Sequence, residues 1–158
     1  MNILLVDDDR IKRKTIVTPI RRNRPETNIR YFENLRDAEY FIDKNHNYTD
    51  LLILDWCFPE TSYERPKAAT GKKMLDYIKE KGYNINTVMC SSDILNIEEL
   101  QEEYPFIIGS LIYGTCNPYE ALYNIYIDYW KKISDRKSSP VDISTGSPVK
   151  KLVNPDVK

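Results

Sequence analysis

Acidic and hydroxyl side chains follow three apolar segments of this sequence. Asp7 and Asp8 come directly after the first segment, Asp55 follows another, and Ser91 follows a third. Carboxylates that lie close together repel one another, and a hard divalent cation relieves that repulsion. Oxygen ligands with room for water molecules suit Mg²⁺. If the fold brings these side chains together, they can form a magnesium site beside a hydroxyl group.

Short apolar runs and helix-like segments alternate along the chain. Unbroken apolar runs are typical of strands that are covered on both faces of a parallel sheet. The alternation therefore predicts an α/β fold, with helices on both faces of the sheet. At this length we favour the flavodoxin-like, doubly wound sheet of five strands in the order 2-1-3-4-5. We expect strands at residues 3–6, 29–32, 51–54, 87–90 and 107–113, and helices at 10–22, 35–44, 71–81, 96–103 and 118–133.

Local signals predict where several of these helices begin and end. Asn34 is expected to cap the second helix, and Thr70 to cap the third, which should stop at Gly82. Pro19 should kink or shorten the first helix, because proline lacks the backbone N–H group. We expect Asp9 to be only a loop residue or a helix cap.

The predicted topology brings the acidic residues to one place. In the order 2-1-3-4-5 the first, third and fourth strands are neighbours, and right-handed crossovers make them parallel. Their carboxyl ends share the edge of the sheet at which ligands bind in this architecture. We therefore expect Asp7, Asp8 and Asp55 to meet beside Ser91. The alternative is that all of them are ordinary loop residues or helix caps.

Three motifs of the chain resemble those of receiver domains in the two-component response-regulator family. They lie at residues 3–9, 52–59 and 88–92. The resemblance implies that Asp55 accepts a phosphoryl group from a histidine kinase or a phosphotransfer protein. It also implies that Asp7 and Asp8 help to hold Mg²⁺, together with the Asp55 carboxylate and the backbone carbonyl of Cys57. The Ser91 hydroxyl would then bond a phosphoryl oxygen.

The chain also departs from the family pattern. Receiver domains usually have a lysine before a proline after the fifth strand, and the matching residue here is Asn117, which brings no charge. The segment at 60–70 is longer than usual. One hypothesis is that Arg65 or Lys67 folds over the site and supplies the missing charge, and the alternative is a solvated loop. Tyr113 is the candidate for the family's switch aromatic, with a core or edge tyrosine as the alternative.

These features favour a stand-alone receiver that signals by changing its affinity for a partner protein, and not an enzyme. The missing lysine favours an alternative, a degenerate receiver that acts as a phosphate-independent adaptor. A haloacid-dehalogenase-type phosphohydrolase would place a second acid where this chain has Cys57. Flavin binding would need phosphate-cradling glycines, which the first turn lacks.

Composition limits the class of protein and its setting. The chain has 158 residues, with 23 Lys+Arg against 24 Asp+Glu and a formal net charge of -1. Balanced charge argues against a dedicated nucleic-acid or membrane-surface protein. Three cysteines without metal-like spacing suggest reduced thiols and a cytoplasmic location. We expect a receiver domain at 1–133 and, because residues 134–158 lack aromatic residues, a flexible tail after it.

Two predicted helices are candidate surfaces for partner proteins. The last helix contains aromatic side chains in two stripes, which fits either a homodimer through this helix or a wide buried face. The first helix is basic, which fits either the docking of a phosphotransfer protein or a solvated face.

Overall fold

The computed structural model describes residues 1–67, 70–114 and 117–125, and its helices and strands alternate as the sequence predicts. The elements are β1 (Asn2–Val6), α1 (Arg10–Asn23), β2 (Asn28–Phe32), α2 (Leu35–Asn45), the 3₁₀ helix η1 (His46–Tyr48), β3 (Leu51–Asp55), α3 (Thr70–Glu80), β4 (Thr87–Ser91), α4 (Ile97–Glu103) and β5 (Ile107–Ile112). Residues 118–125 are also helical. The predicted remainder of this last helix, the domain boundary at 133 and the tail lie outside the described residues.

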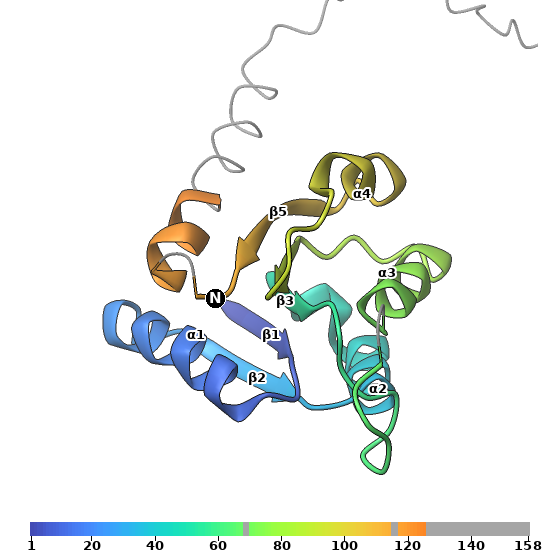
Figure 1. Ribbon diagram of the computed structural model, residues 1–158, viewed down its shortest axis with the longest axis horizontal. Coiled ribbons are helices and arrows are strands. Elements are labelled where there is room, and N and C mark those ends of the chain that lie inside the picture. Colours follow the sequence, from blue (N-terminus) through green and yellow to red (C-terminus); the bar gives the residue numbers. More distant parts are fainter. Residues whose placement is uncertain (68–69, 115–116, 126–158) are drawn as a thin grey trace, which may run out of the picture.

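The strands form one parallel sheet in the order β2-β1-β3-β4-β5, which confirms the predicted flavodoxin-like topology (Figure 1). Val6 pairs with Leu54 across β1 and β3, and Asp55 pairs with Cys90 across β3 and β4. The residues that follow these pairs therefore leave the sheet at the same edge.

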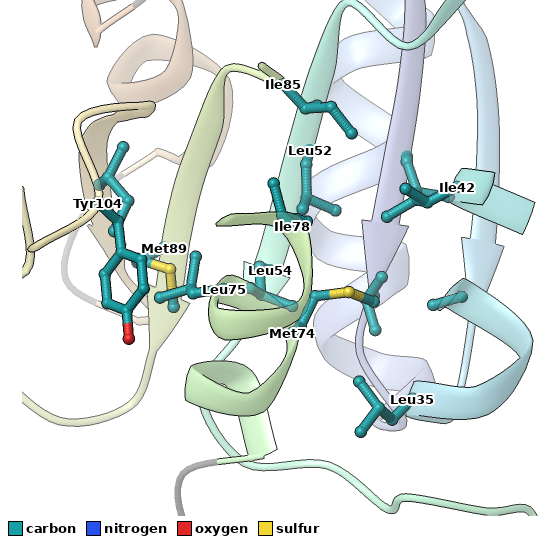
Figure 2. Packing of buried hydrophobic residues seen from close by; sticks show 14 of the residues in the cluster. Leu35, Ile42, Leu52, Leu54, Met74, Leu75, Ile78, Ile85, Met89 and Tyr104 are labelled. Atoms are coloured by element: carbon teal, nitrogen blue, oxygen red, sulfur yellow. The ribbon is translucent and has the colours of Figure 1, made fainter. Parts of the chain in front are cut away.

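Two apolar layers cover the sheet, one on each face. Leu4 and Val6 of β1 point to the layer formed with α2, α3 and α4, whereas Ile3 and Leu5 point to the layer formed with α1 and the last helix. Figure 2 shows Met74, Leu75 and Ile78 of α3 packed on Leu52 and Leu54 of β3. The side chains of β3 are buried on both faces, so this strand holds Asp55 on a rigid support.

Most of the predicted helix ends are confirmed. The Asp9 side chain accepts hydrogen bonds from the N–H groups at the start of α1, and the Asn34 side chain caps α2 by accepting from the Asp37 N–H group at 3.0 Å. Gly82 ends the turn after α3 with a φ of 68°, a conformation that suits glycine.

One predicted helix cap is wrong. Thr70 is the first residue of α3 and not its cap, and its hydroxyl donates to the Lys67 carbonyl at 3.0 Å. Of the two effects expected of Pro19, shortening does not occur, because α1 continues to Asn23. The Asn23 side chain donates to the Pro19 carbonyl at 2.8 Å and so supports this last turn.

The long link between β3 and α3 is folded onto the start of α2. Phe58 and Lys67 form an isolated antiparallel bridge that closes the segment. The backbone N–H groups of Leu35 and Arg36 donate to the carbonyls of Pro59 and Glu60 at 3.0 and 3.1 Å. Within the described part of the chain, no helix is long and apolar enough to cross a membrane.

Candidate functional site

Three carboxylates meet at the carboxyl edge of the sheet, as the sequence predicts. Asp7 and Asp8 follow β1, Asp55 ends β3, and oxygen atoms from all three side chains lie within 4.8 Å of one another. Asp7 is fully buried, Asp55 is 2% exposed, and Asp8 is half-buried. The pairing of β1 with β3 fixes this cluster, because it aligns the ends of the two strands.

The carboxylates are held in an environment that opposes their charge. Burial and the nearby Asp55 carboxylate raise the pKa of Asp7 to about 7. Burial also raises the pKa of Asp8 and the pKa of Asp55, the latter against the opposing effect of Lys12. The cluster is therefore electrostatically unfavourable without a cation.

Two oxygen atoms of the cluster also lack hydrogen bonds. Oδ2 of Asp7 and Oδ2 of Asp55 are buried and have no hydrogen-bond partner within the described residues. Buried polar atoms without a partner are uncommon in folded proteins and point to an ion or ligand that the fold is prepared to bind. Hard oxygen donors in this arrangement fit a magnesium ion.

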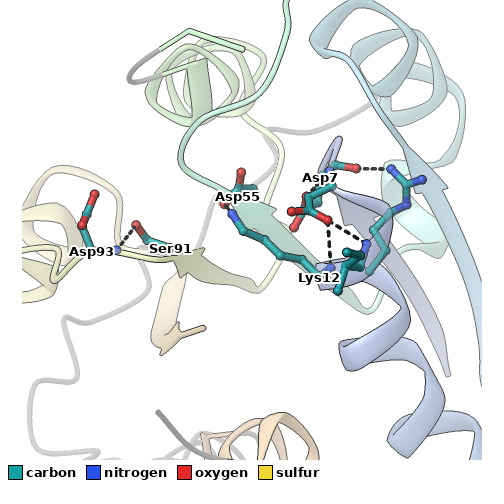
Figure 3. Close-up of polar contacts among 8 residues, drawn as sticks. Asp7, Lys12, Asp55, Ser91 and Asp93 are labelled. Carbon is teal, nitrogen blue, oxygen red and sulfur yellow. Dashed lines mark hydrogen bonds and ion pairs between the residues drawn. The ribbon is translucent and has the colours of Figure 1, made fainter. Parts of the chain in front are cut away.

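Lys12 of α1 is a candidate site residue that the sequence does not single out. Its Nζ lies 3.3 Å from Oδ1 of Asp55, and the side chain is 16% exposed (Figure 3). Burial lowers the pKa of Lys12, but the Asp55 and Asp7 carboxylates outweigh it and leave this pKa raised. The ammonium group is therefore charged and directed into the acidic cluster.

The start of α1 is anchored to the end of β1, and this directs Lys12 toward the cluster. Oδ1 of Asp9 accepts hydrogen bonds from the N–H groups of Ile11 and Lys12 at 2.7 and 3.2 Å. The Arg13 guanidinium donates to the Asp7 carbonyl at 2.7 Å and pairs with Glu33 at 2.6 Å. Arg13 is thus buried, and the basic face that was predicted for this helix is narrower than its sequence indicates.

The predicted hydroxyl residue lies at the end of the neighbouring strand. Ser91 is the last residue of β4 and is buried, and its Oγ accepts a hydrogen bond from the Asp93 N–H group at 3.1 Å. Figure 3 shows both residues beside the Asp55 end of β3. Cys57 lies two residues after Asp55, and its thiol is exposed.

The other predicted site residues lie on the β5 side. Tyr113 follows β5, and its N–H group donates to the Ser91 carbonyl at 2.8 Å. Its ring centroid is 5.9 Å from Nζ of Lys12, and its hydroxyl is 3.5 Å from Oγ1 of Thr15. Asn117 accepts a hydrogen bond from the Tyr119 N–H group at 3.1 Å, so it caps the last helix.

The long link does not bring a positive charge to the cluster. Nζ of Lys67 pairs with Glu60 at 3.4 Å and with Glu64 at 2.9 Å, and Arg65 is exposed. The hypothesis that Lys67 supplies the missing charge is not supported by these contacts. The solvated alternative is correct for its side chain, although the backbone of the segment is tied to α2.

The start of α3 contacts the backbone at Asp55 very closely. A Cβ atom on Gly71 would lie 2.6 Å from the Asp55 carbonyl oxygen and 3.0 Å from Cα of Trp56. The Gly71 N–H group donates to the Trp56 carbonyl at 3.0 Å. Only glycine fits here, so the sequence at the start of α3 helps to position the site.

Comparisons with known proteins support the same architecture. No protein-family model matches the sequence, and no curated protein matches it either. Solved structures do match. The receiver domain of Francisella response regulator 1452 is 18% identical, with a TM-score of 0.62, and the match covers 83% of this chain and 98% of that one.

Two further structures give the same result. A CheY-like response regulator receiver domain protein from Methanospirillum hungatei JF-1 is 14% identical with a TM-score of 0.59, over 85% of this chain and 97% of that one. A two-component response regulator from Clostridium difficile is 16% identical with a TM-score of 0.59, over 88% and 99%. The chain is structurally similar to response-regulator receiver domains and has their flavodoxin-like, CheY-type fold.

Proposed function

We propose that this protein is a receiver that accepts a phosphoryl group on Asp55 and signals by changing its affinity for a partner protein. The observation that carries the proposal is the buried cluster of Asp7, Asp8 and Asp55, with two oxygen atoms that lack partners, at the ligand-binding edge of a receiver-like fold. The proposed donor is a histidine kinase or a phosphotransfer protein, and the proposed setting is the cytoplasm.

The Asp55 carboxylate is the proposed nucleophile. An oxygen of Asp55 forms a bond to the donor's phosphorus, the bond between phosphorus and the donor breaks, and an acyl phosphate results. Burial raises the pKa of Asp55, and the Lys12 ammonium at 3.3 Å opposes this rise. Strand β3, buried on both faces, holds this carboxylate in place.

Asp7, Asp8, the Asp55 carboxylate and the Cys57 carbonyl are the groups proposed to hold Mg²⁺. When it is bound, the ion supplies charge neutralisation for the transferring phosphoryl group. The Ser91 hydroxyl accepts from the Asp93 N–H group and keeps its own proton for donation to a phosphoryl oxygen. Tyr113 is proposed as the aromatic residue that responds to the modification.

Phosphorylation by a small-molecule donor tests the function. The full chain is incubated with acetyl phosphate or phosphoramidate and Mg²⁺, and the product is followed by Phos-tag gels and intact-mass spectrometry. We expect a mass increase of one phosphoryl group that is absent with EDTA and in Asp55→Asn. Asp93→Asn, which changes an exposed carboxylate at the same edge, should be phosphorylated like the wild type.

A phosphate-independent adaptor is the second candidate. It is favoured by Asn117, which caps a helix where the family has its lysine, and by Lys12, which already neutralises Asp55. Absence of phosphorylation at millimolar donor and Mg²⁺ would contradict the receiver proposal. Unchanged partner binding by Asp55→Ala would then establish the adaptor.

A homodimer through the last helix is also proposed, because this helix exposes an aromatic side chain. Leu122 and Ile125 pack on the sheet, whereas Tyr123 is 44% exposed and stacks on Tyr119. Light scattering with and without beryllofluoride, a phosphoryl mimic, tests whether the modified protein associates. A monomer under both conditions would contradict the dimer.

A further inference from the structure

We propose that Lys12 is the residue that binds the phosphoryl group on Asp55, so that helix α1 supplies the positive charge which Asn117 cannot. This inference rests on the proposed function and names a binding residue for it. The carrying observation is the contact of 3.3 Å between Nζ of Lys12 and Oδ1 of Asp55 inside a site that is otherwise acidic.

The position of Lys12 on α1 explains how it reaches the site. Asp9 caps the helix, so Lys12 is the third residue of its first turn. Side chains of a helix lean toward its N-terminus, which here faces the carboxyl edge of the sheet. In the part of the chain that the structure describes, no other lysine or arginine forms an ion pair with Asp7, Asp8 or Asp55.

The charges of the site favour an ammonium group at this point. When they bind a cation in their ionised form, the carboxylates of Asp7, Asp8 and Asp55 bring three negative charges, and a magnesium ion offsets only two of them. Conversion of the Asp55 carboxylate to an acyl phosphate adds further negative charge. The Lys12 ammonium is already in contact with Asp55, and its flexible four-carbon stem lets it follow the new phosphoryl oxygens.

Lys12 also contacts the residue proposed to respond to the modification. Its Nζ lies 5.9 Å from the centroid of the Tyr113 ring, and Thr15, on the same helix, lies 3.5 Å from the Tyr113 hydroxyl. A shift of the ammonium toward a phosphoryl oxygen would change its contact with this ring. The same lysine therefore links the phosphoryl group both to α1 and to the end of β5.

The proposal predicts opposite changes in two affinities when the charge of Lys12 is removed. Before modification the ammonium competes with a metal ion for the carboxylates, so Lys12→Gln should bind Mg²⁺ roughly 3- to 10-fold more tightly. Beryllofluoride, which mimics the phosphoryl group, should bind roughly 10- to 100-fold more weakly, because a charge-assisted hydrogen bond is lost. A merely structural role would not move the two affinities in opposite directions.

The experiment titrates the full chain with Mg²⁺ and then, at saturating Mg²⁺, with beryllofluoride. Tryptophan fluorescence follows both steps, because Trp56 is adjacent to Asp55. Lys12→Gln is compared with the wild type and with Lys14→Gln, which removes an exposed lysine of the same helix. Lys12→Met, which keeps an unbranched apolar stem but lacks the ammonium group, repeats the test should the glutamine variant fold poorly.

The outcomes separate this inference from the function beneath it. Opposite shifts in the Lys12 variants, with Lys14→Gln like the wild type, would support Lys12 as the phosphoryl-binding residue. Equal beryllofluoride affinity in the wild type and Lys12→Gln would overturn that role and leave the receiver function intact. Failure of the wild type itself to bind beryllofluoride would count against the proposed function, and the role of Lys12 would fall with it.

Discussion

Carboxylates in two regions of the molecule have their pKa values shifted in opposite directions. Three carboxylates around α3 have hydrogen-bonding partners: the exposed Asp43 and Glu103 and the half-buried Glu60. Asp43 accepts from Tyr77 and Tyr83, Glu60 from Lys67 and Lys73, and Glu103 from Lys72 and Tyr104. These hydrogen bonds lower the pKa of each acid. At the edge of β1 and β3 the acids are more buried, their pKa values are raised, and two oxygen atoms lack partners.

The difference separates acids that are paired near the surface from acids whose environment suits a cation. Exposed ion pairs contribute little to stability individually, but they cost little to form. Buried carboxylates that repel one another, each with one oxygen atom left without a partner, are unfavourable, so keeping them together lowers the stability of the fold. Lys12 neutralises only part of this charge, which leaves the cluster prepared for a cation.

Removal of one buried carboxylate should have the largest effect on Mg²⁺ affinity and on stability. We expect Asp7→Asn to lose Mg²⁺ affinity by roughly 100-fold, because a ligand is replaced by an amide. At pH 8 in EDTA the same variant should gain about 4 kcal/mol in free energy of unfolding, since a buried charge and its repulsion with Asp55 are removed. Calorimetric Mg²⁺ titration and urea unfolding measure the two effects, and a variant that loses stability in EDTA would contradict the interpretation.

The dependence of stability on pH should show the raised pKa of Asp7. In the folded chain this pKa is about 7, against 3.8 as the ordinary value, so folded Asp7 keeps its proton where the unfolded chain has lost it. This contribution to stability is full below about pH 4 and is lost as the pH rises through 7. We expect a loss on the order of 4 kcal/mol in EDTA, measured as the difference between wild type and Asp7→Asn.

That difference should shrink when Mg²⁺ is added, because a bound cation favours the charged carboxylate and stabilises the folded wild type. An identical pH dependence in the wild type and in Asp7→Asn would show that Asp7 does not titrate in this range.

A change in the support of the site should have an intermediate effect. Gly71→Ala places a methyl group against the Asp55 carbonyl oxygen, at 2.6 Å before any adjustment, so the backbone must move. We expect a loss of roughly 1–2 kcal/mol in stability and weaker Mg²⁺ binding. The control is Gly82→Ala, which has no atom within 4 Å but a φ of 68°. It should lose about 1 kcal/mol without any change in Mg²⁺ affinity.

The smallest effect is expected where the charges are paired at the surface. Glu103→Gln weakens its contacts with Lys72 and Tyr104 but leaves the sheet edge untouched. We expect a slight decrease in Tm and an unchanged Mg²⁺ affinity. A change in Mg²⁺ affinity comparable to that of Asp7→Asn would show that the two regions are coupled, which the structure gives no reason to expect.

The sequence predicts the sheet and the acidic cluster for the same physical reason. Unbroken apolar runs such as 51–54 mark strands covered on both faces, and their order follows from chain connectivity. Once the order is known, Asp7 and Asp55 must emerge at one edge. Their convergence therefore needs no knowledge of side-chain contacts.

Lys12 could not be selected in this way, because it lies in a run of basic residues. Arg10, Lys12, Arg13 and Lys14 all suit a solvated helix face, and only the geometry of the helix start decides which of them turns inward. The signal was present in the cap at Asp9: a residue three positions after a cap leans back toward the preceding strand end. That Asn117 brings no charge follows from its residue type, but its helix-capping bond depends on the backbone that follows it.

The bridge between Phe58 and Lys67 makes the long link part of the framework. Its carbonyls accept from the first two N–H groups of α2, groups that every helix leaves unsatisfied by its own turns. A shorter link would thus leave the first N–H groups of α2 without their hydrogen-bond acceptors. The long link and α2 therefore support each other, so a displacement at the end of β3 can be transmitted through the link to α2.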